Sequence, residues 1–200
     1  IFILYIMATK IKITRSDKFL TQKLYLALLD DFINDSFAGR RTRKNGARIS
    51  KATVVSYEYL KKQLVDYSEK PSAQELKIYI VNHLTQGQKE QAGKYYKKFY
   101  TSFCNFLYDD KKYFDNYVGL IIKTMRSFFN YVEQERNISV GTFHKSFYVP
   151  KEEIPIVALS ADQLNYIIND ETFNVMVKKS KLEETKDVFV FGCTVALRIS

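Results

Sequence analysis

The chain has 200 residues and a formal net charge of +9, from 31 Lys and Arg against 22 Asp and Glu. Hydrophobic residues make up 46% of it and charged residues 26%, proportions typical of a globular protein with a packed core. Seven Gly and three Pro are too few turn formers for an all-β sandwich or a disordered chain. No apolar run reaches the roughly 20 residues that cross a bilayer, so we expect no contact with a membrane.

Four residues bear on disulfide and metal chemistry. Cys104 and Cys193 lie far apart in apolar segments, which predicts reduced thiols in a cytoplasmic protein. His83 and His144 do not combine with them at the spacing of a zinc site. The sequence also has no glycine-rich phosphate loop and no nucleophile elbow. We therefore expect no metal, no cofactor and no small-molecule substrate.

Residues 1–16 are predicted to be an N-terminal extension with a short arm. Six apolar residues precede Met7. We interpret Met7 as the translation start and those six residues as an upstream extension; a genuine first strand is the alternative. Ile11 and Ile13 alternate with polar residues, a pattern typical of a short β-like arm.

Helical periodicity dominates residues 17–136. Apolar side chains recur there at three-four spacing in four stretches, which predicts helices that each bury one face. The stretches are 19–37, 50–68, 96–107 and 114–132. Gly39 stands where a left-handed C-cap ends the first helix, and a short further helix is expected after the capping box Ser72-x-x-Glu75. These elements predict one helical domain.

The periodic pattern breaks between residues 137 and 159. Pro150 and Pro155 lie in this segment, and Pro disfavours helix at and just before itself. We therefore interpret residues 137–159 as an interdomain linker, with short β-type runs at 147–149 and 154–157.

A second domain is predicted over residues 160–200. It opens with another capping box, Ser160-x-x-Gln163. A final helix is expected from about Leu182 to Ile199, with acidic residues at its start that suit the helix dipole. Because the chain stops at Ser200 directly after this apolar run, we interpret these residues as the truncated start of a larger domain.

The strongest electrostatic signal is the run from Arg40 to Lys51, which has six cations and no acid in twelve residues. Phosphates relieve the repulsion within such a run, and their condensed counterions are released on binding. The next helix begins near Ser50, and its N-terminal amides offer a further place for a phosphate. The predicted DNA-binding residues are Arg40, Arg41, Arg43, Lys44, Arg48, Ser50, Lys51 and Thr53. A solvated loop and a nuclear-localisation signal stay open as alternatives.

Cations outside this run are of two kinds. Lys97, Lys98 and Lys123 are interspersed with acids and are interpreted as ordinary surface. Arg198 differs, because it is the only charged residue from Val188 to Ser200. A buried guanidinium needs an acceptor, which is either an internal carboxylate or a bound phosphate. The residues alone leave both readings open.

Four segments together resemble a known family. Residues 191–200 (Phe-Gly-Cys-Thr-Val-Ala-Leu-Arg-Ile-Ser) resemble the first catalytic box of tyrosine recombinases, the phage integrases. Residues 159–164 are similar to the capped helix that opens their catalytic domain, and residues 49–57 and 125–133 resemble their helical SAM-like core-binding domain. The order and spacing of these segments, over roughly 17–200, most closely resemble integrases of Bacteroides-type mobile elements.

The resemblance implies a mainly α fold, with a SAM-like DNA-binding domain over 17–136 and the first helices of an α+β catalytic domain over 160–200. It implies site-specific integration and recombination of double-stranded DNA through a 3′-phosphotyrosine intermediate, by a protein that forms a homotetramer on DNA. Arg198 would match the first catalytic arginine and bind the scissile phosphate. Ala196 departs from the family's usual Gly.

The same comparison leaves open whether this chain is itself an enzyme. It stops before the positions where the family has an acidic residue, a lysine hairpin, a His-x-x-Arg box and the nucleophilic Tyr, so we expect it to bind DNA without completing the active site. Two other readings stay open. One is a non-catalytic helical DNA-binding accessory or regulatory protein, and the other is a helical scaffold with a solvated basic loop.

Overall fold

A computed structural model describes residues 17–153 and 158–195 of the chain. Within these ranges it contains seven α-helices and a two-stranded sheet, so the predicted mainly α fold class is confirmed. The chain divides into two compact units, Ile1–Glu152 and Glu153–Ser200. The expected N-terminal arm, the β-type run at 154–157 and Arg198 lie outside the described residues.

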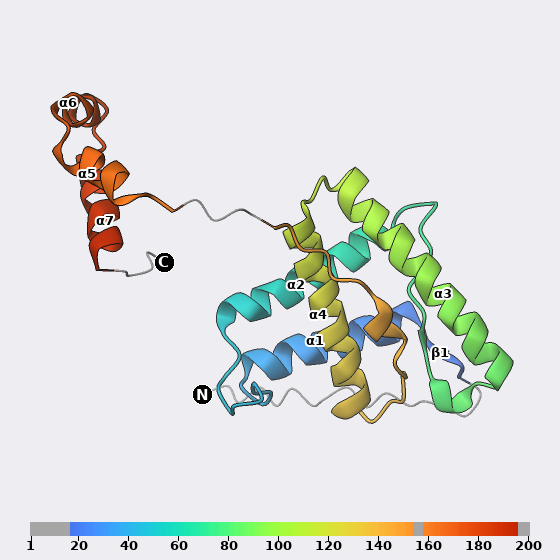
Figure 1. The fold of residues 1–200 in the computed structure, drawn as a ribbon. Helices are drawn as coiled ribbons and strands as arrows, with labels where there is room; N and C mark the ends of the chain where they lie inside the picture. The colour runs from blue at the N-terminus through green and yellow to red at the C-terminus, as the bar shows by residue number, and fades with distance from the viewer. Residues whose placement is uncertain (1–16, 154–157, 196–200) are drawn as a thin grey trace. The chain divides into compact units, whose positions relative to one another are not determined.

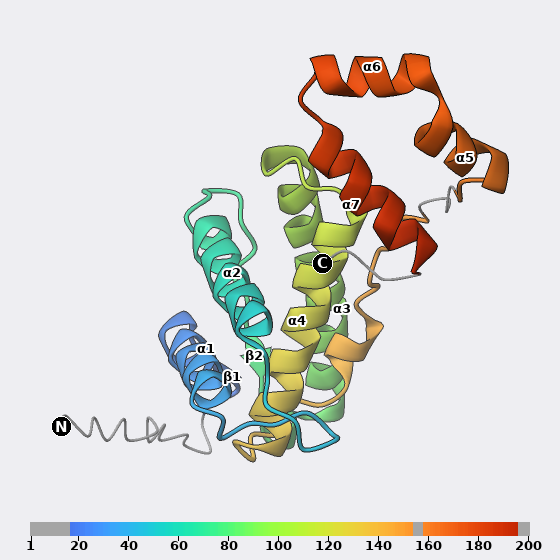
Figure 2. The same cartoon turned by 90° about the vertical axis from the view of Figure 1, so that its left-hand side faces the viewer.

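The first unit is built on four long helices (Figure 1). They are α1 (Gln22–Phe37), α2 (Lys51–Ser68), α3 (Gln86–Asn105) and α4 (Asp115–Gln134). Figure 2 shows α4 with α1 and α2 on one side and α3 on the other. The end of α3 continues as one π-helical turn, Phe106–Asp110, and a 3-10 turn, Phe143–Ser146, follows α4.

Aromatic side chains join these helices. The centre of the Phe32 ring on α1 lies 4.3 Å from the centre of the Tyr57 ring on α2 and 5.2 Å from that of the Tyr131 ring on α4. Tyr96 of α3 meets Phe129 of α4 at 5.9 Å. All five rings are buried, and burying one aromatic side chain stabilises the fold by roughly 1.5–3 kcal/mol. The predicted apolar stripes are therefore core.

The predicted short helix after Ser72 is wrong. These residues form a turn and then β2 (Ile78–Tyr79), which pairs antiparallel with β1 (Phe19–Leu20). Alternate apolar side chains are buried here, Leu76, Ile78 and Ile80. That period of two fits a strand with one inward face, and it outweighs the capping-box spacing.

Glycines at 87 and 93 give α3 an ambiguous start in the sequence, but the structure is helical from Gln86. Thr85 provides the reason. Its hydroxyl accepts from the amide of Gln88 at 3.4 Å, and the side chain of Gln88 accepts from the amide of Thr85 at 3.0 Å. This reciprocal capping box satisfies two amides that the first turn leaves unpaired.

The described part of the predicted linker, residues 137–153, belongs to the first unit as far as Glu152. The hydroxyl of Tyr100 donates to the carbonyl of Tyr148 at 2.9 Å, and the amide of Glu152 donates to Oδ1 of Asn116 at 3.1 Å. We call residues 147–152 the strap. Gly119 of α4 lies directly beneath it, and a Cβ added there would collide with the carbonyl of Pro150.

The second unit has three described helices. They are α5 (Ala161–Asn169), α6 (Glu171–Lys179) and α7 (Glu183–Thr194). The predicted capping box is confirmed. Ser160 Oγ accepts from the amide of Gln163 at 3.2 Å, and Oε1 of Gln163 accepts from the amide of Ser160 at 2.9 Å. Large apolar side chains of α7 stay exposed, with Phe191 60% accessible.

Candidate nucleic-acid interface

The arginine-rich run folds as a short hairpin between α1 and α2. Thr42 and Arg48 form an antiparallel bridge, the amide of Arg43 donates to the carbonyl of Ala47 at 2.8 Å, and the amide of Gly46 donates to the carbonyl of Arg43 at 2.8 Å. Gly46 has a φ of +77°, which favours glycine. This is the three-residue hairpin loop with a left-handed glycine. We call residues 42–48 the basic hairpin.

Arg41, at the base of the hairpin, is built into the fold. Its side chain is only 14% exposed, and its Nε donates to Oε1 of Glu135 at 2.8 Å. Its guanidinium lies 4.3 Å from the centre of the Phe32 ring and donates to Ser36 Oγ at 2.9 Å. These contacts tie the hairpin to the ends of α1 and α4.

Arg40 also has an internal carboxylate partner, Asp35, at 2.7 Å. The second oxygen of Asp35 accepts from the hydroxyl of Tyr131 at 2.8 Å. Burial, and after it the bond to Asp35, raises the pKa of Tyr131, so the phenol stays neutral and keeps donating. Two of the eight predicted DNA-binding residues thus carry charges that the protein itself neutralises.

The other four cations of the run have no such partner. Arg43, Lys44, Arg48 and Lys51 are exposed, and none of them forms an ion pair with a carboxylate within residues 17–153 and 158–195. The guanidinium of Arg48 lies beside Gly39, whose φ of +75° matches the predicted C-cap position. The unneutralised charge of the run is therefore concentrated on the hairpin and on the first residue of α2.

Ser50 and Thr53 lie side by side at the start of α2. Ser50 is the N-cap, and its Oγ accepts from the amide of Thr53 at 3.3 Å. The two hydroxyls are 2.9 Å apart. Because the amide of Thr53 already donates to Ser50 Oγ, it is not free to bind a phosphate. Thr53 itself lines the neighbouring groove.

This groove, of about 390 Å³, separates the first half of α2 from the middle of α4. Its lining is rich in hydroxyl groups and includes one cation. The lining residues are Ala52, Thr53, Ser56, Tyr57, Leu120, Lys123, Thr124 and Ser127. We call it the α2–α4 groove. Thr53 lines it at the third position of α2, the helix that follows the basic hairpin in the chain.

Sequence reasoning missed Ser56, Lys123 and Ser127. The usable signal was weak: a polar position one turn after Thr53 on α2, and Lys123 with Ser127 one turn apart on α4. Nothing in the residue spacing says that these two polar edges face one another, because that depends on how α2 packs on α4.

There is no group of three or more His, Cys, Asp or Glu side chains that could hold a metal ion in the described part of the chain. No helix within it is long and apolar enough to cross a membrane. The cysteines at 104 and 193 are both free thiols, one buried and one exposed.

Comparison of the chain with protein-family models, with curated proteins and with solved structures found no match.

Proposed function

We propose that this chain is the DNA-binding portion of a site-specific tyrosine recombinase, a cytoplasmic protein that integrates and recombines double-stranded DNA. The observation that carries the DNA-binding part is the concentration of unneutralised charge on the basic hairpin and on the first residue of α2, the helix whose first half also lines the α2–α4 groove. Four cations there have no carboxylate partner in the described chain, and Thr53, another of the predicted DNA-binding residues, lines a groove rich in hydroxyl groups.

Such a surface suits a phosphate backbone. Lys, Arg, Ser and Thr side chains are among those that form hydrogen bonds to DNA phosphates. Such bonds fix the position of the protein on the duplex and do not read the base sequence. Clustered free cations also repel one another, and neutralisation by phosphates removes that cost while counterions are released.

The recombinase part of the proposal is supported by the resemblance and by the two-unit helical layout. In the full-length protein, Arg198 would bind the scissile phosphate and stabilise the charge on its non-bridging oxygens. Strand exchange would proceed through a 3′-phosphotyrosine intermediate in a homotetramer, without metal or cofactor.

Salt-dependent duplex binding tests the DNA-binding part. With four phosphates neutralised, log K should fall against log salt with a slope of about −3.6. In the variant Arg43→Gln/Lys44→Gln/Lys51→Gln the slope should shrink to about −1. The control, Lys62→Gln/Lys151→Gln/Lys179→Gln, removes the same charge from exposed sites outside this surface and should bind as the wild type does. Salt-insensitive binding, or equal losses in both variants, contradicts the proposal.

Covalent capture tests the recombinase part. The protein encoded by the whole reading frame should form a covalent adduct with a nicked suicide duplex, and Arg198→Ala should lower adduct formation by about 100-fold or more while duplex affinity is kept. Salt-dependent binding with no adduct would instead favour the accessory or regulatory DNA-binding protein.

A further inference from the structure

The solvent face of α3 carries a second group of unpartnered cations. Lys94, Lys97 and Lys98 are exposed, and none forms an ion pair in the part of the chain that the structure describes. At helical spacing they continue into Thr101 and Asn105 on the same side of the helix. Glu90 is the one acidic residue of α3. We call these five residues the α3 face.

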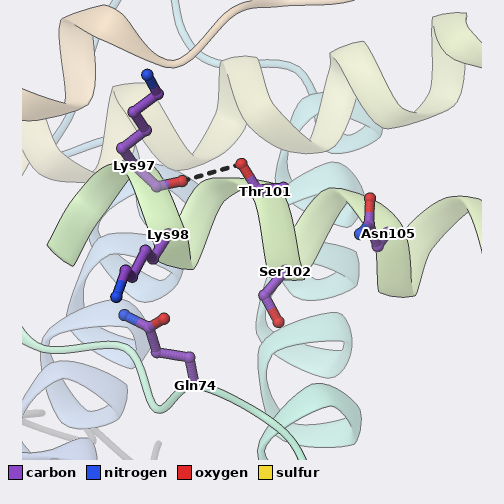
Figure 3. Close-up of a pocket in the computed structure, with 6 residues that line it drawn as sticks. All are labelled: Gln74, Lys97, Lys98, Thr101, Ser102 and Asn105. Atoms are coloured by element: carbon purple, nitrogen blue, oxygen red, sulfur yellow. Dashed lines mark hydrogen bonds between the residues drawn. The ribbon is translucent and has the colours of Figure 1, made fainter. Parts of the chain in front are cut away.

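A pocket of about 520 Å³ opens on this face. Its lining consists of Lys97, Lys98, Thr101, Ser102, Asn105 and, from the segment before β2, Gln74. Figure 3 shows Lys98 and Ser102 along the edge of the α3 face that is nearer Gln74, and Lys97 with Thr101 along its other edge.

The walls of the pocket are held by hydrogen bonds. The amide of the Gln74 side chain donates to the carbonyl of Tyr95 at 3.2 Å. The hydroxyl of Tyr67 donates to Ser102 Oγ at 2.7 Å and accepts from the backbone amide of Gln74 at 3.0 Å. The ammonium groups of Lys97 and Lys98 have no bond of this kind to any described residue, so they are the groups left for an outside ligand.

The chemistry of the lining favours a phosphate backbone over a protein partner. Every lining side chain is a lysine, an amide or a hydroxyl, which are the types that contact phosphate oxygens. A protein interface is usually anchored by a buried aromatic or aliphatic side chain, and none of the residues that line this pocket is aromatic or aliphatic. Lysines act as point charges and suit contacts that do not depend on base sequence.

The α3 face lies away from the basic hairpin. The hairpin is fixed to the ends of α1 and α4 through Arg40 and Arg41. In Figure 1 it lies at the left of the first unit and α3 at the right, and in Figure 2 it lies in front with α3 behind. A ligand on one of these surfaces therefore leaves the other accessible.

We propose that the α3 face is a second nucleic-acid surface, which holds the phosphate backbone of another duplex while the hairpin and the α2–α4 groove hold the first. The unit would then bridge two DNA segments. This inference rests on the proposed DNA-binding function, because the hairpin must hold the first duplex.

A capture assay with the 200-residue chain tests it. One duplex is fixed to beads, protein is bound and washed, and a fluorescent second duplex is added. Wild-type protein should retain the second duplex. The variant Lys94→Gln/Lys97→Gln/Lys98→Gln should retain about tenfold less of it, while its affinity for a single limiting duplex changes less than about twofold. The control Lys62→Gln/Lys151→Gln/Lys179→Gln should behave as wild type in both assays.

Several results would overturn the inference. If the α3 variant captures the second duplex as well as wild type does, the face is not a second site. If the α3 variant loses single-duplex affinity as much as the variant Arg43→Gln/Lys44→Gln/Lys51→Gln does, which we call the hairpin variant, the two surfaces act as one. Sedimentation of the protein without DNA gives a further test. If wild type forms an oligomer and the α3 variant does not, capture of the second duplex reflects self-association. If polyglutamate displaces the second duplex at lower concentration than unlabelled duplex does, the face suits an acidic protein.

The same data separate this inference from the proposed function. If the hairpin variant has the same affinity for a single duplex as wild type, the proposed function is contradicted, whatever the α3 variant does. If the hairpin variant loses single-duplex binding and the α3 variant still captures the second duplex normally, the proposed function is supported. Only the bridging of two duplexes is then contradicted.

Discussion

Arg41 and Arg43 stand two residues apart in one basic run, yet their surroundings differ. The Arg41 guanidinium is enclosed by Phe32, Ser36 and Glu135, whereas Arg43 is exposed at the turn of the hairpin. A charged hydrogen bond of this kind contributes about 1.5–3 kcal/mol, and a desolvated cation–π contact adds up to about 2 kcal/mol. The first arginine therefore stabilises the fold, and the second has no carboxylate partner in the described chain.

We predict that Arg41→Gln lowers the free energy of unfolding by about 2–3 kcal/mol, because it removes the charged bond to Glu135 and the contact with Phe32. Arg43→Gln should change it by less than about 0.5 kcal/mol. Urea denaturation followed by circular dichroism measures both. Equal stability of the two variants would show that the anchoring of Arg41 is misassigned.

The same contrast shows what the sequence could predict at this scale. A cation run and its bias toward phosphate are visible in the residue order. The partners of Arg41 are not, since Glu135 lies 94 residues further along the chain and meets it only because α1 packs on α4. The α2–α4 groove depends on packing in the same way.

Among the elements, long apolar stripes predicted well. The expected helices 19–37, 50–68 and 114–132 correspond to α1, α2 and α4, with boundaries shifted by up to three residues. The failures lie where two local signals compete. After Ser72 an alternating apolar pattern outweighs a capping box, and at the start of α3 the Thr85 cap outweighs two glycines.

The strap depends on one glycine of α4. A Cβ at position 119 would collide with the carbonyl of Pro150 and lie 3.4 Å from the side chain of Val149. We predict that Gly119→Ala displaces residues 147–152, costs about 1–3 kcal/mol of stability, and speeds proteolytic cleavage in that segment. The contacts of Tyr100 and Asn116 with the strap would be lost with it.

Gly87 of α3 provides the matched control. A Cβ added there meets nothing within 4 Å, so Gly87→Ala should be neutral or stabilise the helix by up to about 1 kcal/mol. Limited proteolysis and thermal unfolding compare the two variants. A strap that stays protected in Gly119→Ala would mean that α4 and the strap can separate without cost.

At the scale of the whole molecule, charge is distributed unevenly. The run from Arg40 to Lys51 holds six of the cations behind the net charge of +9, and only Arg40 and Arg41 among them have carboxylate partners in the described chain. A molecule of this kind is expected to bind polyanions in a strongly salt-dependent way. Its stability, by contrast, depends on an aromatic core that contains one buried histidine.

His144 couples that core to pH. It stacks on Phe129 with ring centres 5.1 Å apart, and its Nε2 lies 2.9 Å from Oδ1 of Asn130, while its Nδ1 is buried with no hydrogen-bond partner among the described residues. Burial first, and then the charges of Lys145 and Arg126, lower its pKa from 6.5 to about 4. Because the unfolded chain takes up this proton more readily, the neutral form stabilises the fold at pH values above 6.5.

We predict that this stabilisation is lost as the pH falls from 6.5 to about 4 and changes little below that. The loss amounts to at most about 3.5 kcal/mol, at roughly 1.4 kcal/mol for each unit of pKa difference. His144→Phe keeps a ring against Phe129 and cannot titrate, so its unfolding free energy should fall less steeply over this pH interval than that of the wild type. Denaturation series at pH 7, 5.5 and 4 measure the free energy of unfolding of both proteins. The titration of the carboxylates is the same in both, so it cancels in the difference between them. Parallel profiles for wild type and variant would mean that His144 is protonated as easily in the fold as in the unfolded chain, and that the orphaned Nδ1 is reached by water.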